Sequence, residues 1–201
     1  MHKKYIILII LSIIIGLFIY HRYHNDYMIY IPNFMDESDM KDLKNHIKNT
    51  NEIKRNRNGL LTKTLNSDIF YSPKYLNKMS ELVGKNVYKS EIPTEYRLYD
   101  KSQGMNWHSD ILLYEIPQYE CVYTVSNDSD STTDYIDHWG FKHKVWTEPN
   151  SLMIVKAKGY RHGVNPVNTG KREIVKLIYT PTDKINKRNI NAYNMALNGI
   201  T

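Results

Sequence analysis

Between Thr94 and Tyr179 the chain contains short segments that are rich in β-branched and aromatic residues and are separated by turn signals. These segments are Thr94–Tyr99, Cys121–Val125, Lys144–Trp146, Ser151–Val155 and Glu173–Tyr179. A polar run at 127–134 and the sequence Glu148-Pro149-Asn150 are predicted to be a loop and a turn. Because short strands bury their apolar sides by packing two sheets together or by closing a barrel, the pattern predicts a β-sandwich or β-barrel.

Two amphipathic helices are predicted upstream of these strands. The first follows Asp36, a suitable N-cap, and places Met40, Leu43 and Ile47 at helical spacing. The second is expected to begin at Pro73 and to end before Gly84. Helices followed by strands indicate the α+β class, with helices packed on the β part.

Size and charge narrow the possible functions. The chain has 201 residues, which is typical of one domain, and a net charge of +6. Lys3, Lys4 and Arg22 flank an N-terminal apolar segment, and the remainder carries 24 basic and 21 acidic residues. This balance does not indicate a nucleic-acid-binding surface. Because Cys121 is the single cysteine, an intrachain disulfide and a Cys-rich zinc module are excluded.

The N-terminal apolar segment predicts a membrane anchor. Tyr5 to Tyr20 is an uncharged run of 16 residues. No small-residue cleavage site follows it, so an uncleaved signal anchor over residues 1–24 is favoured over a cleaved signal peptide. Lys3, Lys4 and the free amine outweigh Arg22, which predicts a single-pass membrane protein whose following domain is lumenal or extracytoplasmic.

His108 and Asp110 are separated by one residue, so on an extended strand both side chains point to the same face and can bind one metal ion. A His-x-Asp pair by itself is most often a surface pair. With one distant histidine, the set becomes the two-histidine, one-carboxylate triad that is typical of non-haem Fe(II) oxygenases. That triad leaves coordination positions open for a chelating co-substrate and O₂.

Three downstream histidines are candidates for the third ligand: His138, His143 and His162. The first two lie in a loop-rich segment without a preceding strand, whereas His162 follows the predicted strand Ser151–Val155. Arg172 comes ten positions after His162, and its guanidinium fork is suited to holding a carboxylate. His162 is therefore the preferred third ligand.

At these residues the chain resembles the iron- and 2-oxoglutarate-dependent dioxygenases, and within them the prolyl 4-hydroxylase-like branch. The family's His-x-Asp, distant His and basic residue ten positions later are matched by His108, Asp110, His162 and Arg172. The stretch from His162 to Arg172 is similar to the branch's distal loop, and Tyr99 is similar to the strand tyrosine that contacts the co-substrate. The similarity spans about residues 27–180. The region 131–135 departs from it, because it lacks the usual glycine pair.

The resemblance implies a double-stranded β-helix (jelly-roll) core, with N-terminal packing helices, in a domain over residues 25–182. It implies Fe(II) bound by His108, Asp110 and His162, with no further catalytic residue. Its co-substrate, 2-oxoglutarate, would be held by Arg172 and Tyr99, with O₂ as oxidant and ascorbate as reductant. Residues 183–201 form a C-terminal tail, predicted to be helical or partly disordered.

Three further residues are weaker candidates for this site. Lys176 shares a strand face with Arg172, although a solvated strand-end lysine is the simpler interpretation. Trp107 would either line the pocket or pack in the core. Tyr123 is placed inside the barrel near the co-substrate.

The resemblance favours hydroxylation of a protein or peptide side chain, prolyl in the first place or lysyl. One alternative is a 2-oxoglutarate oxygenase that acts on nucleic acid or a small molecule. Demethylation of nucleic acid is disfavoured, because Arg172-Glu173-Ile174 does not begin the Arg-x-Asn-x-x-x-x-x-Arg arrangement that such an enzyme would need. The other alternative is a jelly-roll binding module without catalytic activity. The presence of all four groups, the three candidate metal ligands and Arg172, argues against it.

Overall fold

The fold is built on two antiparallel sheets. The computed structural model describes residues 2–25, 28–50, 54–55 and 60–199. The larger sheet contains β1 (Met28–Ile31), β2 (Lys54–Arg55), β3 (Leu61–Leu65), β4 (Tyr88–Lys89), β5 (Thr94–Tyr99), β7 (Tyr119–Asn127), β10 (Ser151–Lys156) and β12 (Arg172–Thr180). The smaller sheet contains β6 (Met105–His108), β8 (Thr133–Ile136), β9 (Lys142–Val145) and β11 (His162–Val164).

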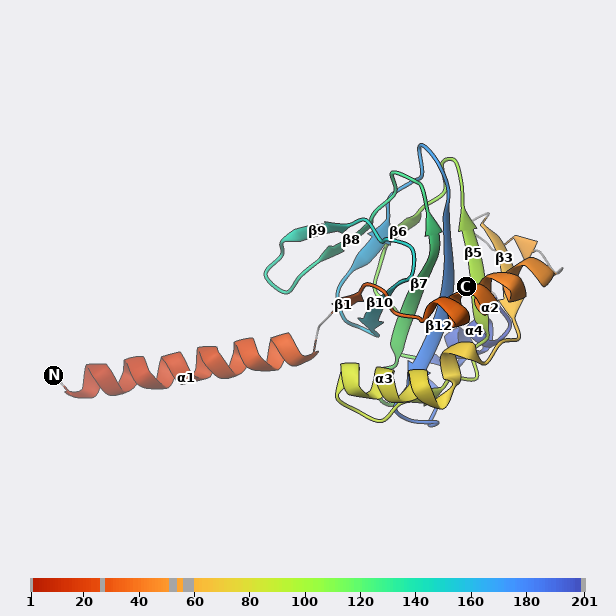
Figure 1. Cartoon of the computed structure of the whole chain (residues 1–201). Helices are drawn as coiled ribbons and strands as arrows, with labels where there is room; N and C mark the ends of the chain where they lie inside the picture. The colour runs from red at the N-terminus through yellow and green to blue at the C-terminus, as the bar shows by residue number, and fades with distance from the viewer. Residues whose placement is uncertain (1, 26–27, 51–53, 56–59, 200–201) are drawn as a thin grey trace.

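From β5 to β12 the chain passes back and forth between the two layers (Figure 1). In the larger sheet the order is β1-β10-β7-β12-β5-β3-β2, with β4 paired to β12. In the smaller sheet the order is β6-β11-β8-β9. The antiparallel, β-rich core fits a jelly-roll-like fold and confirms the predicted α+β class with a sandwich or barrel.

One face of the larger sheet is covered by helices. Along β7 and β12, alternate residues such as Cys121, Tyr123, Val175 and Leu177 are buried in one apolar cluster. The cluster also contains Phe34, Met35, Leu43, Ile47, Phe70, Tyr75 and Met79. Most of these come from α2 (Glu37–Asn49), α3 (Pro73–Val83) and the 3-10 turn Ile69–Tyr71, so this is where the predicted amphipathic helices bury their apolar faces.

The two predicted helices have the expected ends. Asp36 precedes α2 and has the extended backbone of an N-cap residue, although its side chain makes no capping hydrogen bond. Pro73 is the first residue of α3, and Gly84 follows the helix with φ of 68°. This left-handed conformation is the usual reason for a glycine at the end of a helix.

The other face of the larger sheet points toward the smaller sheet. Tyr99, Ile174 and Val122 meet Val164 and Val167 there, together with Leu60. Arg172 belongs to this inner face, because it is two residues from Ile174 on the same strand. Candidate residues from both sheets therefore face one interior space.

The C-terminal segment is ordered and closes one end of that space. It contains the 3-10 turn Lys187–Asn189 and the helix α4 (Ile190–Leu197). Tyr193 and Ala196 pack with Ile92, Leu113 and Ile178 in a separate apolar cluster. The segment is thus the helical one of the two predicted forms.

The membrane prediction is wrong. In the described part of the chain, no helix combines the length and the apolar character needed to cross a bilayer. The first helix, α1 (His2–Asn25), stands apart from the sheets (Figure 1), and its uncharged run covers 16 residues. About 20 consecutive apolar residues are needed to span the hydrocarbon layer. The predicted single-pass topology and lumenal location of the domain are therefore withdrawn.

Gly170 provides a stability test of the loop between β11 and β12. Its φ is 72°, and an added Cβ would lie 2.4 Å from the backbone oxygen of Asp128. Gly140 has φ of 87°, but an added Cβ there would meet no atom within 4 Å. We expect Gly140→Ala to lower the free energy of unfolding by about 1 kcal/mol through backbone strain alone. Gly170→Ala should lower it by roughly 1–3 kcal/mol more, because the clash adds to the strain.

Urea denaturation followed by circular dichroism measures both changes. Equal losses of stability in the two variants would show that the contact between Gly170 and Asp128 is absent in solution.

Candidate metal centre and active-site cavity

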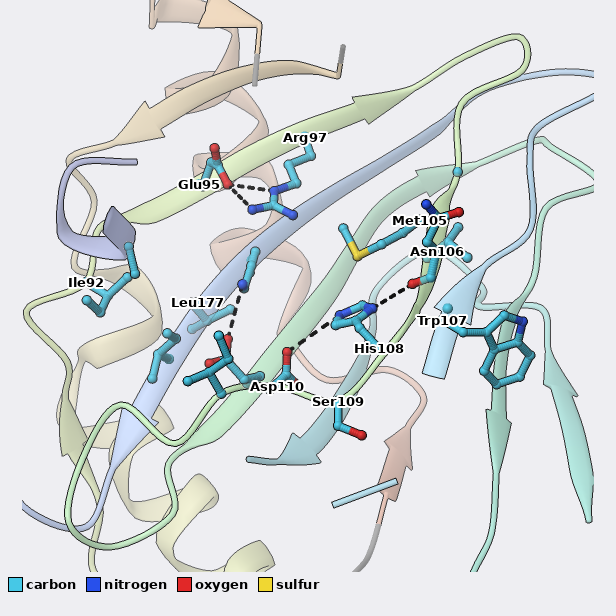
Figure 2. A pocket seen from close by; sticks show the side chains of 18 of the residues that line it. Ile92, Glu95, Arg97, Met105, Asn106, Trp107, His108, Ser109, Asp110 and Leu177 are labelled. Carbon is cyan, nitrogen blue, oxygen red and sulfur yellow. Dashed lines mark hydrogen bonds and ion pairs between the residues drawn. The ribbon is translucent and has the colours of Figure 1, made fainter. Parts of the chain in front are cut away.

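Three candidate ligands meet at the edge of the smaller sheet. His162 on β11 lies directly opposite His108 on β6, and the two ring centroids are 4.4 Å apart. Asp110 follows the end of β6; its Oδ1 lies 3.7 Å from His108 Nε2 and its Oδ2 lies 3.6 Å from His162 Nε2. One ligand atom from each residue falls within 4.8 Å of the others, which suits a single metal ion. Figure 2 shows His108 and Asp110 pointing toward each other.

Backbone carbonyls fix the orientation of both imidazoles. His108 Nδ1 lies 2.8 Å from the carbonyl oxygen of Asn106, and His162 Nδ1 lies 3.0 Å from that of Tyr160. A carbonyl oxygen can only accept, so Nδ1 carries the hydrogen in each ring and Nε2 is free to bind a metal. Burial also lowers the pKa of His108, which favours the neutral, metal-binding form.

Gln118 braces the segment that carries Asp110. This fully buried side chain accepts a hydrogen bond from the Leu113 amide and donates one to the Ile111 carbonyl. The Asp110 carbonyl itself accepts a hydrogen bond from the Lys158 amide at 3.0 Å. The backbone is therefore held at Asp110 and in the residues that follow it.

The donor set fits a divalent metal ion. Within the described part of the chain, Asp110 Oδ2 is buried and makes no hydrogen bond. A buried carboxylate oxygen without a partner is unfavourable, and a cation bound between the histidines would remove that penalty. Two neutral imidazoles and one carboxylate suit Fe(II) better than a metal that prefers only oxygen ligands.

A second unsatisfied group lies deeper between the sheets. Arg172 is 1% exposed; its Nη2 donates to Thr133 Oγ1 at 2.9 Å, but its Nε and Nη1 have no hydrogen-bond partner among the described residues. Burial lowers the pKa of Arg172, and the nearby Tyr99 opposes this. Tyr99 lies directly opposite Arg172 on β5. Two free donors on a buried guanidinium fit a carboxylate ligand.

A cavity of about 750 Å³ opens beside the metal ligands. Its walls include His108 and Asp110, two charged pairs on the larger sheet, and small residues from α4. Arg97 Nη2 lies 2.5 Å from Glu95 Oε2, and Lys176 Nζ lies 3.3 Å from Glu120 Oε2. Figure 2 shows Glu95 and Arg97 on one strand, facing the same space as His108.

Sequence comparison finds no matching family model and no matching curated protein. Comparison with solved structures does find matches. An oxidoreductase of the 2OG-Fe(II) oxygenase family from Burkholderia pseudomallei superposes with a TM-score of 0.69 at 9% identity, over 80% of this chain and 87% of the other. The chain has the fold of the 2-oxoglutarate-Fe(II) oxygenases.

Two further oxygenase structures show the range of this fold. One is the α-ketoglutarate-dependent epimerase SnoN from nogalamycin biosynthesis, with a TM-score of 0.65 at 14% identity, over 80% of each chain. The other is a prolyl hydroxylase from Trichoplax adhaerens in complex with a hypoxia inducible factor peptide fragment. It has a TM-score of 0.60 at 13% identity, over 80% of this chain and 86% of the other. Proteins with this fold therefore include one that is bound to a peptide and one from the biosynthesis of nogalamycin.

Two threonines near Arg172 were not found from the sequence. Thr133 accepts the one hydrogen bond that Arg172 makes. Thr124 on β7 lies opposite Ile174, so its side chain shares the inner face with Arg172, and its buried Oγ1 has no hydrogen-bond partner in the described chain. Thr124 lies in the predicted strand Cys121–Val125, whereas Thr133 lies in the run 127–134 that was predicted to be a loop and is the first residue of β8. Their proximity to Arg172 depends on the pairing of strands.

Tyr123 is not near the candidate co-substrate site, which corrects its predicted role. Its neighbours Glu120 and Val122 belong to the inner face of β7, while Tyr123 points to the opposite face. There its ring packs with Phe34 and Phe70, and its hydroxyl donates to Asn150 Oδ1 at 3.0 Å. Tyr123 is a core residue beneath the helices.

Trp107 and Lys176 both contact the cavity, in different ways. Trp107 is 36% exposed and is turned away from His108 (Figure 2), with Lys142 Nζ 5.1 Å from its ring centroid. It forms part of the outer rim. Lys176 lies on the inner wall beside Glu120, so it is not the solvated strand-end lysine of the simpler interpretation.

His143 lies away from the triad. Although the sequence predicted a loop at this residue, His143 is on β9, and its Nε2 lies 2.7 Å from Asp137 Oδ2. Among the described residues, the cluster that can hold a metal contains His108, Asp110 and His162.

His162→Ala should abolish tight binding of one divalent ion, because it removes one of three ligands, while His143→Ala should leave binding unchanged. Calorimetric titration of the purified chain with Fe(II) under nitrogen, or with Ni(II), measures the stoichiometry and affinity. We expect a loss of affinity larger than the ~10–100-fold that is typical when a group supporting a ligand is removed. Equal binding by the two variants would place the metal elsewhere.

Proposed function

We propose that the chain is a Fe(II)- and 2-oxoglutarate-dependent oxygenase that hydroxylates a protein or peptide side chain, prolyl in the first place. The observation that carries the proposal is the pairing of two buried, unsatisfied groups in one interior. Asp110 lacks a cation, and Arg172 lacks an anion. A metal ion and a dicarboxylate that bridges from the metal to Arg172 would satisfy both groups.

The residues of the chain have separate tasks in this proposal. His108, Asp110 and His162 hold the metal, which supplies activation of O₂ and of the chelated 2-oxo acid when bound. Arg172 holds the far carboxylate of 2-oxoglutarate with its two free N–H donors, and Tyr99 lies beside it on β5. Thr124 provides a further hydroxyl on the same face.

Lys176 lines the cavity, and we assign it a supporting role. It shares the inner face of β12 with Arg172, four residues away, which corresponds to about 13 Å along a strand. Its charge contributes to lowering the pKa of His108, so it lies within electrostatic range of the metal ligands. Lys176 thus stabilises negative charge at the metal-facing end of the cavity.

A small-molecule oxygenase is the second candidate. The cavity of about 750 Å³ is large enough for a drug-sized molecule, and the neighbour SnoN is an enzyme of nogalamycin biosynthesis. A binding module without activity is the third; it would use Asp110 and Arg172 to hold a metal and an anion without turnover.

The activity test is the release of succinate from 2-oxoglutarate, with Fe(II) and ascorbate supplied and with a panel of proline-containing peptides and small molecules. His108→Ala should abolish succinate release. Mass spectrometry for a product with one added oxygen identifies the substrate. Absence of turnover with every metal tested, in a chain that still binds the metal, would favour the binding module.

Arg172→Gln should raise KM for 2-oxoglutarate by roughly 10–100-fold, because it removes a charge-assisted hydrogen bond of ~1.5–3 kcal/mol. Arg172→Lys should restore part of the affinity. The exposed neighbour Lys171, changed to Gln, provides the matched control with an unchanged KM. Thermal melts establish that the Arg172 variants are folded.

A 2-oxo acid without the second carboxylate separates the role of Arg172 from a general structural one. The wild-type chain should strongly prefer 2-oxoglutarate over 2-oxobutyrate, and Arg172→Gln should lose most of that preference. A preference that survives in the variant would assign the far carboxylate to another residue, with Lys176 as the first to test.

A further inference from the structure

A row of aromatic side chains leads away from the metal ligands across the smaller sheet. Tyr135 on β8 lies directly opposite His162 on β11, and His143 on β9 lies directly opposite Tyr135. Because cross-strand partners point to the same face, His108, His162, Tyr135 and His143 form one row. Neighbouring strands are about 4.8 Å apart, so the row extends ~10 Å beyond His162.

Two further rings widen this row into a surface. Tyr160 stacks on Tyr135, with centroids 5.8 Å apart and planes 5° from parallel, and His138 stacks on Tyr160 at 6.4 Å and 16°. Tyr135 and His143 are stacked at 4.6 Å and 15°. We call Tyr135, His138, His143 and Tyr160 the aromatic platform. Three of these residues lie on the β8–β9 hairpin, which projects beyond the larger sheet (Figure 1), and Tyr160 lies just before β11.

The end of the hairpin continues the platform with an exposed indole. The Trp139 ring lies 4.7 Å from that of His138 and is 60% exposed. Nothing in the packing of the core requires a tryptophan at this tip. Exposed aromatic side chains that continue a row from an active site indicate a binding surface.

The charges around the platform narrow the class of ligand. The β9 lysines Lys142 and Lys144 alternate with His143, so they point to the opposite face of the sheet. There Lys142 pairs with Asp134. A nucleic acid would need cations beside the rings to neutralise its phosphates, and these lysines are on the wrong side.

The hydrogen-bonding groups beside the platform further restrict the class of ligand that it can bind. Asp137 Oδ1 accepts from the Trp139 and Phe141 amides, and its Oδ2 accepts from His143. This carboxylate is therefore occupied and does not offer acceptors to the hydroxyl groups of a sugar. The exposed Trp139 indole supplies an N–H donor, so the platform suits a ligand that is rich in acceptors.

We propose that the aromatic platform binds the part of a proline-rich, extended peptide that flanks the residue at the metal centre. Proline has no backbone N–H, so such a peptide offers carbonyl acceptors and ring faces. Aromatic grooves recognise polyproline II segments in this way, with rings packed on prolines and N–H groups on carbonyls. At ~3.1 Å per residue, the ~10 Å platform matches about one turn of that helix.

This inference rests on the proposed function only in placing the reacting residue of the peptide at the metal centre. Binding to the platform is measured without turnover. Fluorescence anisotropy of the full chain, with Fe(II) omitted, gives the affinity for a labelled 12-residue proline-rich peptide. A Gly/Ser peptide of equal length, a single-stranded oligonucleotide and an oligosaccharide serve as competitors. We expect the unlabelled proline-rich peptide alone to compete.

Trp139→Ala should weaken binding of the proline-rich peptide by about 10-fold. Tyr160→Leu should do the same, and Tyr160→Phe should retain most of the affinity because the ring remains. Tyr88 on β4 is 57% exposed and lies outside the smaller sheet, so Tyr88→Ala is the matched control with unchanged affinity. Far-UV circular dichroism establishes that the Tyr160 variants are folded.

Unchanged affinity in Trp139→Ala and Tyr160→Leu would overturn the inference, as would equal competition by the Gly/Ser peptide, the oligonucleotide or the oligosaccharide. These results are separable from a failure of the proposed function. If the chain binds the peptide through the platform but releases no succinate, the inference is supported and the proposed oxygenase activity is rejected. If the chain hydroxylates peptides with full activity after loss of Trp139 and Tyr160, the oxygenase activity is supported and the role of the platform is rejected.

Discussion

The antiparallel pairing of β6 with β11 is the interaction on which the candidate site depends. It places His162 opposite His108, although the two residues are far apart in the sequence. The strands approach so closely that a Cβ on Gly163 would lie 2.9 Å from the Met105 carbonyl oxygen. Any larger residue would push β11 away from β6 and separate the imidazoles. The metal ligands are therefore positioned by the sheet itself.

Arg172 shows how the interior is prepared for an anion. The other two cations near the cavity are each paired with a carboxylate, Arg97 with Glu95 and Lys176 with Glu120. Arg172 is as deeply buried as Arg97, yet its one recorded partner is the neutral hydroxyl of Thr133. A buried charge without a counter-charge destabilises a fold by several kcal/mol. Because the strands on both sides remain well packed, a ligand is the natural source of the missing charge.

The sequence was sufficient where the local pattern is strong. Thr94–Tyr99 is a strand because its β-branched and aromatic residues suit a half-buried sheet, and Pro73 and Gly84 mark the ends of a helix by their backbone preferences. The sequence analysis did not predict the short strands β6, β8 and β11, because segments of three or four residues that include polar residues or glycine are too short to show a periodic pattern. They are strands because their partners in the smaller sheet hold them.

The same limit explains the error at Tyr123 and the omission of Thr124. Which of two adjacent residues faces the interior depends on the register of β7 against β12, and a one-residue shift reverses the assignment. That register contains an irregularity between Glu173 and Ile174. A sequence pattern gives the alternation along one strand, but it does not give the face of that strand relative to its neighbour.

The candidate co-substrate site is better defined than any substrate site, so in the proposed function the choice of substrate depends on residues outside the triad. Two parts of the chain outside the triad can influence the choice of substrate. One is the end of the cavity at α4, where Ala192, Ala196 and Gly199 present little side-chain volume and keep the space open. The other is the tip of the β8–β9 hairpin at Trp139, which is exposed and lies outside the part of β8 that pairs with β11. In the proposed function, the cavity end would select for the size of the reacting group, whereas the exposed aromatic row would select for the chain that carries it. In the proposed function, a small ring or side chain carried on an extended polymer would use both features, whereas a free metabolite would use the cavity alone.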